Sequence, residues 1–164
     1  MNTLPQRSNR NKRTNPKNWN QLTLNGADMK LFTHLNFPGN CAEAFHYYEQ
    51  NLGGKLLMLM RQSEAPGGSR NSEGEDPVIH ARIELGGNIL MGNDVPPDHH
   101  QPMRSVYLYL GVDAAEEAER IYSLLMKGGE AYMPLQETFF ASRFSQLRDQ
   151  FGTLWTLIHE RPMS

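Results

Sequence analysis

The sequence contains a single cysteine, Cys41, among its 164 residues. One cysteine cannot form an intramolecular disulfide or a cysteine-cluster metal site, and such sparse use is typical of proteins from a reducing compartment. Long hydrophobic runs are also absent. No stretch reaches the roughly 18 apolar residues of a membrane-spanning helix, and the first residues lack the apolar core of a secretory signal. We therefore predict a cytoplasmic protein without a membrane partner.

The chain has little net charge, but the charge that it has is unevenly placed. Residues 1–30 carry six Lys or Arg residues against one acidic residue, whereas the rest of the chain carries ten against seventeen. A basic arm can bind nucleic acid, but no interleaved aromatics accompany this one, and the body behind it is acidic. We predict that residues 1–28 form a flexible, basic, Asn-rich tail without a nucleic-acid partner, and that Met29 is a candidate for the natural start.

The second half of the chain repeats the first. The segment Glu-Ala-x-x-x-Tyr at 43–48 recurs 74 residues later at 117–122, and a double glycine follows each copy, at 53–54 and at 128–129. A duplicated unit implies two similar modules that pack together. Their junction is a natural place for a concave ligand site.

Hydrophobic periodicity predicts the same order of elements in both copies. Asn40 and Asp113 each have a glutamate three residues later, which predicts a capping box at the start of each helix. Each copy is predicted to run strand, helix, strand, strand, strand. The predicted strands are 31–37, 55–61, 78–85 and 88–91 in the first copy and 105–110, 130–138, 141–148 and 154–159 in the second, with helices from 41 to 52 and from 114 to 127.

This order predicts the α+β class, with tandem βαβββ modules that form curved mixed sheets around a cavity. Four segments resemble the PhnB-like branch of the glyoxalase/bleomycin-resistance/dioxygenase (vicinal oxygen chelate) superfamily. They are Leu-Asn-Phe-x-Gly-Asn-Cys-x-Glu-Ala at 35–44, the stretch 80–94, Met-Pro-Leu-Gln-Glu-Thr-Phe at 133–139 and Asp-x-Phe-Gly-x-x-Trp at 149–155.

The resemblance implies one domain over 29–164, built from module one (29–97) and module two (104–160), that forms a homodimer. Metal-dependent relatives hold one divalent ion with His, Gln or Glu side chains from both modules. Carried over to this chain, those positions are Thr33 or His34, then Ser105 and Thr156. Hydroxyl groups are poor ligands for such ions compared with imidazole or carboxylate. We therefore expect no metal ion or other cofactor.

An alternative metal site stays open. His34 and His80 lie on separate predicted strands, and Glu84 shares a strand face with His80 because strand side chains alternate. These three residues are the ligands that we predict if one divalent metal ion is bound.

Aromatic and polar side chains of both modules are the candidates for contact with a ligand. Tyr107 and Tyr109 alternate on one strand, and an arginine can clamp a carboxylate. The alternative for Trp155 is that it packs in the hydrophobic core and contacts no ligand. The predicted ligand-binding residues are His34, Asn36, His80, Tyr107, Tyr109, Phe140, Arg143 and Trp155.

We predict that the protein binds a small organic molecule between its modules without a metal. The alternative is a metal-dependent lyase, isomerase or dioxygenase with the non-standard ligands above. The branch is often labelled as demethylubiquinone methyltransferases, but no glycine-rich nucleotide loop follows a strand here. Cys41 is a candidate nucleophile at a helix start. It also begins the helix's apolar face, which favours a buried, inert thiol.

Overall fold

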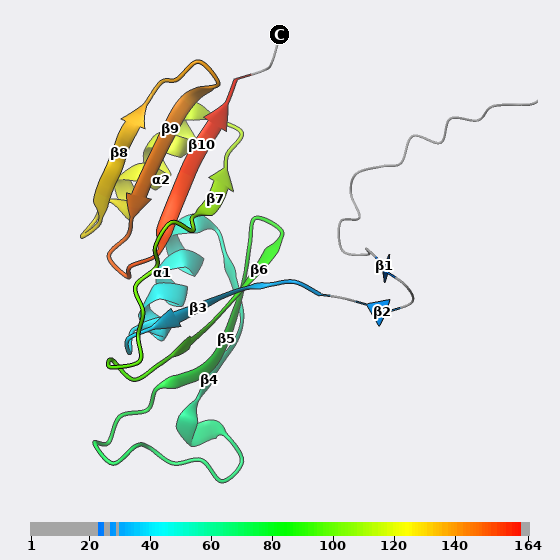
Figure 1. The fold of residues 1–164 in the computed structure, drawn as a ribbon, viewed down its shortest axis with the longest axis vertical. Coiled ribbons are helices and arrows are strands. Elements are labelled where there is room, and N and C mark those ends of the chain that lie inside the picture. Colours follow the sequence, from blue (N-terminus) through cyan, green and yellow to red (C-terminus); the bar gives the residue numbers. More distant parts are fainter. Residues whose placement is uncertain (1–22, 25–26, 29, 162–164) are drawn as a thin grey trace, which may run out of the picture. The chain divides into compact units, whose positions relative to one another are not determined.

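The computed structural model of the protein describes residues 23–24, 27–28 and 30–161. Residues 1–31 and 32–164 form two separate units. In the first unit, β1 (Thr23–Leu24) pairs antiparallel with β2 (Ala27–Asp28). Most of the predicted basic tail, and Met29, lie outside the described residues. The second unit contains both copies of the repeat (Figure 1).

The first copy forms a four-stranded mixed sheet with one helix. Its strand order is β3 (Thr33–Phe37), β6 (Asn88–Asp94), β5 (Val78–Leu85) and β4 (Lys55–Arg61). Strand β3 runs parallel to β6, and the other pairs are antiparallel. Helix α1 (Cys41–Leu52) connects β3 to β4, and the short helix η1 (Gln62–Glu64) opens the loop that leads to β5.

The second copy has the same topology. Its strand order is β7 (Leu108–Gly111), β10 (Leu154–Glu160), β9 (Ala141–Arg148) and β8 (Glu130–Gln136), with helix α2 (Ala115–Leu125). Two βαβββ modules, each with a four-stranded mixed sheet, confirm the predicted α+β class. Within the described ranges, no helix is long and apolar enough to cross a membrane.

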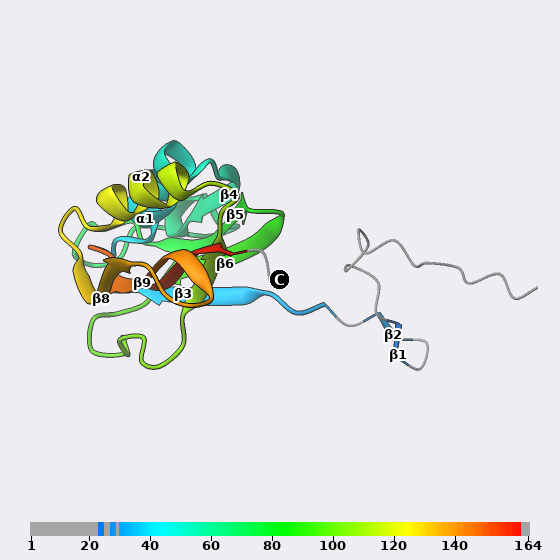
Figure 2. The same ribbon diagram turned by 90° about the horizontal axis from the view of Figure 1, so that it is seen from above.

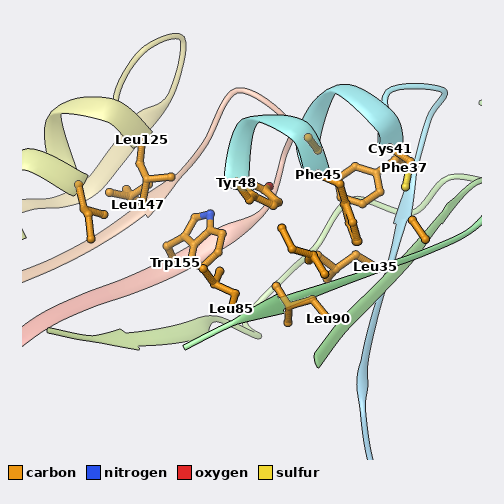
Figure 3. Packing of buried hydrophobic residues seen from close by; sticks show 14 of the residues in the cluster. Leu35, Phe37, Cys41, Phe45, Tyr48, Leu85, Leu90, Leu125, Leu147 and Trp155 are labelled. Atoms are coloured by element: carbon orange, nitrogen blue, oxygen red, sulfur yellow. The ribbon is translucent and has the colours of Figure 1, made fainter. Parts of the chain in front are cut away.

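One hydrophobic core runs through both modules. On β5, alternate side chains Ala81, Ile83 and Leu85 are buried beneath α1, together with Phe45 and Tyr48 of that helix (Figure 3). The core continues to Leu125 of α2 and to Leu147 and Trp155 of the second sheet. In Figure 2 both helices lie on the same side of the two sheets. The opposite face of each sheet, called here the open face, is therefore left without a helix.

The two predicted capping boxes are wrong. Asn40 precedes α1 but makes no side-chain cap hydrogen bond, and the residue before α2 is Ala114 rather than Asp113. The start of α1 is capped instead by Asp94 at the end of β6, whose Oδ1 accepts from the Cys41 N–H at 2.8 Å. The negative charge of this carboxylate is also favourable at the N-terminus of α1, where the helix dipole is positive.

Candidate functional site

The contact between the two modules is packed with side chains. The hydroxyl of Tyr48 donates to Asp149 Oδ2 at 2.7 Å, and Trp155 Nε1–H donates to the same oxygen at 2.9 Å. Asp149 Oδ1 accepts from the backbone N–H groups of Phe151 and Thr153. Burial raises the pKa of Asp149, and hydrogen bonds from Trp155 and Tyr48 oppose that rise. The point at which we expected a ligand cavity is thus filled by core.

Two predicted ligand-binding residues lie on the helix-covered side of the second sheet. Trp155 is 1% exposed and belongs to the core. Arg143 reaches α2, where its Nη2 lies 2.6 Å from Glu119 Oε1. Tyr109 is the register partner of Thr156 and shares its face of the sheet. Because strand side chains alternate, this face is opposite to the one that carries Trp155 and Arg143. The expectation that Arg143 and Trp155 share a cavity with Tyr109 is therefore not met.

The open face of the first sheet carries a cluster of polar side chains. His34 of β3 lies within hydrogen-bond distance of Asn93 of β6, through His34 Nε2 and Asn93 Oδ1. Arg82 Nε–H of β5 donates to His80 Nε2 at 3.0 Å. Asn36 is exposed on the same face, one alternation along β3 from His34. Three of the predicted site residues are thus brought together, and Arg82 joins them.

The hydrogen bonds fix which ring nitrogens carry protons. Asn93 Nδ2–H donates to the Asp94 carbonyl oxygen at 2.9 Å, so Asn93 turns Oδ1, an acceptor, toward His34. His34 therefore donates to Asn93 from a protonated Nε2. His80 accepts at Nε2 and so carries its proton on Nδ1. Burial, with the positive charges of Arg82 and His34, lowers the pKa of His80, which agrees with a neutral ring.

The donor set does not suit a divalent metal ion. Among the residues that the structure describes, no three His, Cys, Asp or Glu side chains converge as metal ligands, and this includes the alternative set His34, His80 and Glu84. Arg82 occupies the Nε2 lone pair of His80 and places a positive charge beside it. The carried-over position Thr156 is buried against Gln146. No catalytic step through a metal follows from this arrangement.

Methionines surround the polar cluster. Arg82 is the register partner of Met58 on β4 and of Met91 on β6, while Met60 is the register partner of His80. Paired residues on neighbouring strands share a sheet face, so these side chains flank the cluster. Sequence reasoning missed Arg82 and the methionines as site residues. Arg82 lies two residues from His80 on β5, and Met58 and Met60 alternate in the same way on β4, which was the signal that could have found them.

The open face of the second sheet is aromatic. Tyr109 donates its hydroxyl proton to Glu160 Oε1 at 2.7 Å. Burial and this carboxylate raise the pKa of Tyr109 to about 12, so the phenol stays protonated. Phe140 packs edge-to-face against Phe144, with ring centroids 5.2 Å apart. Tyr107 is half-buried and precedes β7. A hollow of about 400 Å³ lies beside this face, lined by Gly111, Val112, Asp113, Ile158, His159 and Glu160.

Comparison with known proteins places this geometry in a family. The family model for 3-demethylubiquinone-9 3-methyltransferase matches residues 29–158. Protein YjdN of Escherichia coli K12 is 30% identical over 138 residues, which are 79% of this chain and 94% of that protein. More distant solved structures of glyoxalase/bleomycin-resistance/dioxygenase proteins share the fold alone.

Two solved structures are similar over the same region. Protein PA1353 from Pseudomonas aeruginosa is 34% identical, with a TM-score of 0.72, and the match covers 80% of this chain and 98% of that one. A PhnB protein from Bacillus cereus is 28% identical, with a TM-score of 0.69, and the match covers 80% and 99%.

Proposed function

The chain belongs to the 3-demethylubiquinone-9 3-methyltransferase family, the PhnB-like branch of the glyoxalase/bleomycin-resistance/dioxygenase superfamily, and from this premise we propose that it binds a small organic molecule. One observation carries the proposal. The open face of the first sheet holds His34, His80 and Arg82 in defined hydrogen-bonding states beside exposed apolar side chains. A few oriented polar groups set in an apolar surround are the usual features of a small-molecule site.

The aromatic open face of the second sheet supports the same proposal. Tyr109 and Phe140 offer large apolar contact areas, and the Tyr109 hydroxyl adds a polar handle. Both residues were predicted from the sequence to contact a ligand. Tyr107, Tyr109 and Phe140 stay in the proposed set with His34, Asn36 and His80. Arg143 and Trp155 leave it because α2 and the core hold them.

We propose that a second copy of the chain closes the site, so that the protein acts as a homodimer. Both open faces of a single chain carry exposed hydrophobic side chains. Phe139 is 92% exposed, Tyr109 59% and Met58 40%. Exposed apolar side chains that lie together on one face are typical of protein interaction sites. Light scattering at micromolar concentration tests the proposal, and a mass of one chain at all concentrations would contradict it.

Catalysis with a non-standard metal site remains the alternative function. Elemental analysis of natively purified wild type, His34→Ala and His80→Ala distinguishes metal-dependent catalysis from metal-free ligand binding. Near-stoichiometric metal that disappears in either variant would favour a lyase, isomerase or dioxygenase. We expect less than one equivalent of metal per chain, because Arg82 competes with a metal ion for the lone pair of His80 Nε2.

Methyl transfer has less support, although the family description names it. The known dinucleotide-type folds bind their cofactors at the carboxyl ends of a mostly parallel, doubly wound sheet. Here each sheet is mixed and four-stranded, and the first strand-to-helix turn is occupied by the Asp94 carboxylate. We propose that the description reflects the family's label and that this chain binds its ligand without a methyl donor.

A thermal-shift screen of a chemically diverse library tests ligand binding directly. A ligand that binds only the native state raises the melting temperature. Hits should stabilise wild type and the control His46→Ala, since His46 lies on the exposed face of α1 near Glu49. They should lose most of their effect on His34→Ala. If no compound stabilises the wild type, or if the hits act equally on all three proteins, the proposed site is wrong.

A further inference from the structure

We propose that the ligand of the first sheet's open face is an organic carboxylate with a flat apolar body, held by the Arg82 guanidinium between Met58 and Met91. The inference rests on the proposed small-molecule function and adds the chemical class of the molecule. The pairing of Arg82 differs from that of four arginines on the second module.

Arg82 has no carboxylate partner among the described residues. Its side chain makes one hydrogen bond, from Nε–H to the neutral imidazole of His80. Among the seven other arginines that the structure describes, Arg61, Arg70 and Arg104 make no such ion pair, whereas four pair with carboxylates. These pairs are Arg120 with Glu117, Arg143 with Glu119, Arg148 with Glu130 and Arg161 with Glu137. A guanidinium without a counter-ion, on a chain whose body is more acidic than basic, can attract an anion.

His80 also orients the guanidinium. Because Nε–H is engaged, the edge that carries Nη1 and Nη2 is left to donate two parallel hydrogen bonds. That edge matches the two oxygens of a carboxylate. The imidazole of His80 adds little positive charge, because burial and the nearby cations lower its pKa. One permanent cation suits a monoanion better than a doubly charged phosphate group.

The methionines define the rest of the molecule. Met58 and Met91 flank Arg82 on the two neighbouring strands, and Met60 lies beside His80. Methionine side chains are flexible and make favourable sulfur contacts with aromatic rings. The same face thus offers a cation for the carboxylate and an adaptable apolar surface for the body attached to it.

The test compares 2-naphthoate with its neutral amide, 2-naphthamide, using methyl NMR of methionine-labelled protein. Resonances are assigned with Met58→Leu, Met60→Leu and Met91→Leu. We expect 2-naphthoate to shift these three methyl signals and to bind at least ~10-fold more tightly than the amide, the factor that a charge-assisted hydrogen-bonded pair supplies.

Variants of Arg82 identify the group responsible. Arg82→Gln should weaken 2-naphthoate binding by ~10-fold or more and leave the amide unchanged, which also shows that the variant is folded. Arg82→Lys keeps the charge but loses the two-pronged geometry, so its affinity for 2-naphthoate should lie between those of wild type and Arg82→Gln. Arg70→Gln removes an equal charge from the loop after η1, where Arg70 donates to the Gly74 carbonyl, and should change nothing.

The outcomes separate this inference from the proposed function. Equal binding of the acid and the amide, or shifts confined to Met126 and Met133 of the second module, would overturn the carboxylate assignment. If the library screen yields only neutral ligands for the His34 face, the carboxylate class is wrong while the binding function stands. Failure of acids and neutral compounds alike would remove both.

Discussion

The Tyr48 hydroxyl on α1 donates to the buried carboxylate of Asp149 across the boundary between the modules, at 2.7 Å. We expect Tyr48→Phe to lower the free energy of unfolding by about 1–3 kcal/mol, since a buried carboxylate loses a donor. Tyr47→Phe is the matched control. Its hydroxyl also crosses the boundary, to the Leu124 carbonyl at 2.8 Å, but from a less buried position. Urea unfolding measures the free energy of unfolding of both variants. Equal losses would show that the burial of Asp149 does not make the Tyr48 hydrogen bond more stabilising than that of Tyr47.

The cap of α1 gives a second prediction. Asp94 accepts from the Cys41 N–H and from the Val78 N–H, each at 2.8 Å. Asp94→Ala removes both acceptors and should lower the free energy of unfolding by about 2–4 kcal/mol. Asn40→Ala should change it by less than about 0.5 kcal/mol, because Asn40 makes no cap hydrogen bond. Chemical denaturation measures both changes. A loss of stability in Asn40→Ala above the expected limit would mean that Asn40 caps the helix, as the sequence predicted.

These two cases show what the sequence could and could not predict. The strand 55–61, the helix 41–52 and the strand 141–148 were predicted at their observed bounds, because local periodicity and glycine stops determine them. The cap failed because Asp94 is more than fifty residues away along the chain. Local motifs such as the capping box are read from neighbours, and they cannot detect a partner that the sheet brings in.

The candidate site was predicted less well for a related reason. The sequence indicated which strands carry polar and aromatic residues, so His34, His80 and Tyr109 were named as candidates. It did not indicate which face of β9 and β10 the helix covers. Arg143 was therefore assigned to a ligand, although it pairs with Glu119 on α2. Trp155 had two open roles, and the core role is the one that the structure shows.

Gly92 permits the close approach of α1 to the sheet. A Cβ at this position would lie 2.9 Å from the Phe45 ring and 3.2 Å from Cys41 Sγ. Gly92→Ala should lower the free energy of unfolding by about 1–3 kcal/mol, the usual cost of overpacking. Gly111→Ala is the matched control on β7, since its Cβ would meet only Tyr109 Cε1 at 3.7 Å. Denaturant midpoints that shift equally for the two variants would argue against a tight helix–sheet contact.

Cys41 should be nearly inert toward thiol reagents in the native protein. Burial, with the nearby Asp94 charge, raises the pKa of its thiol from 9.0 to about 12. The thiolate is the reactive species, so at pH 8 its population should be about 1,000-fold lower than for an unperturbed thiol. Iodoacetamide labelling followed by mass spectrometry should be very slow until denaturant is added. Rapid labelling under native conditions would contradict this and would reopen a nucleophilic role.

Titration of His80 reports on the contact that the carboxylate proposal needs. Burial is the main cause that lowers the pKa of His80, and the positive charge of Arg82 is the next. Arg82→Gln removes that charge and frees Nε2 to take a proton, so the pKa of His80 should rise toward its ordinary value. Histidine NMR across pH 4–8 measures the change, with Arg70→Gln as the control of equal charge. An unchanged titration in Arg82→Gln would mean that the guanidinium does not rest against His80 in solution. Arg82 would then lack the orientation that a carboxylate clamp requires.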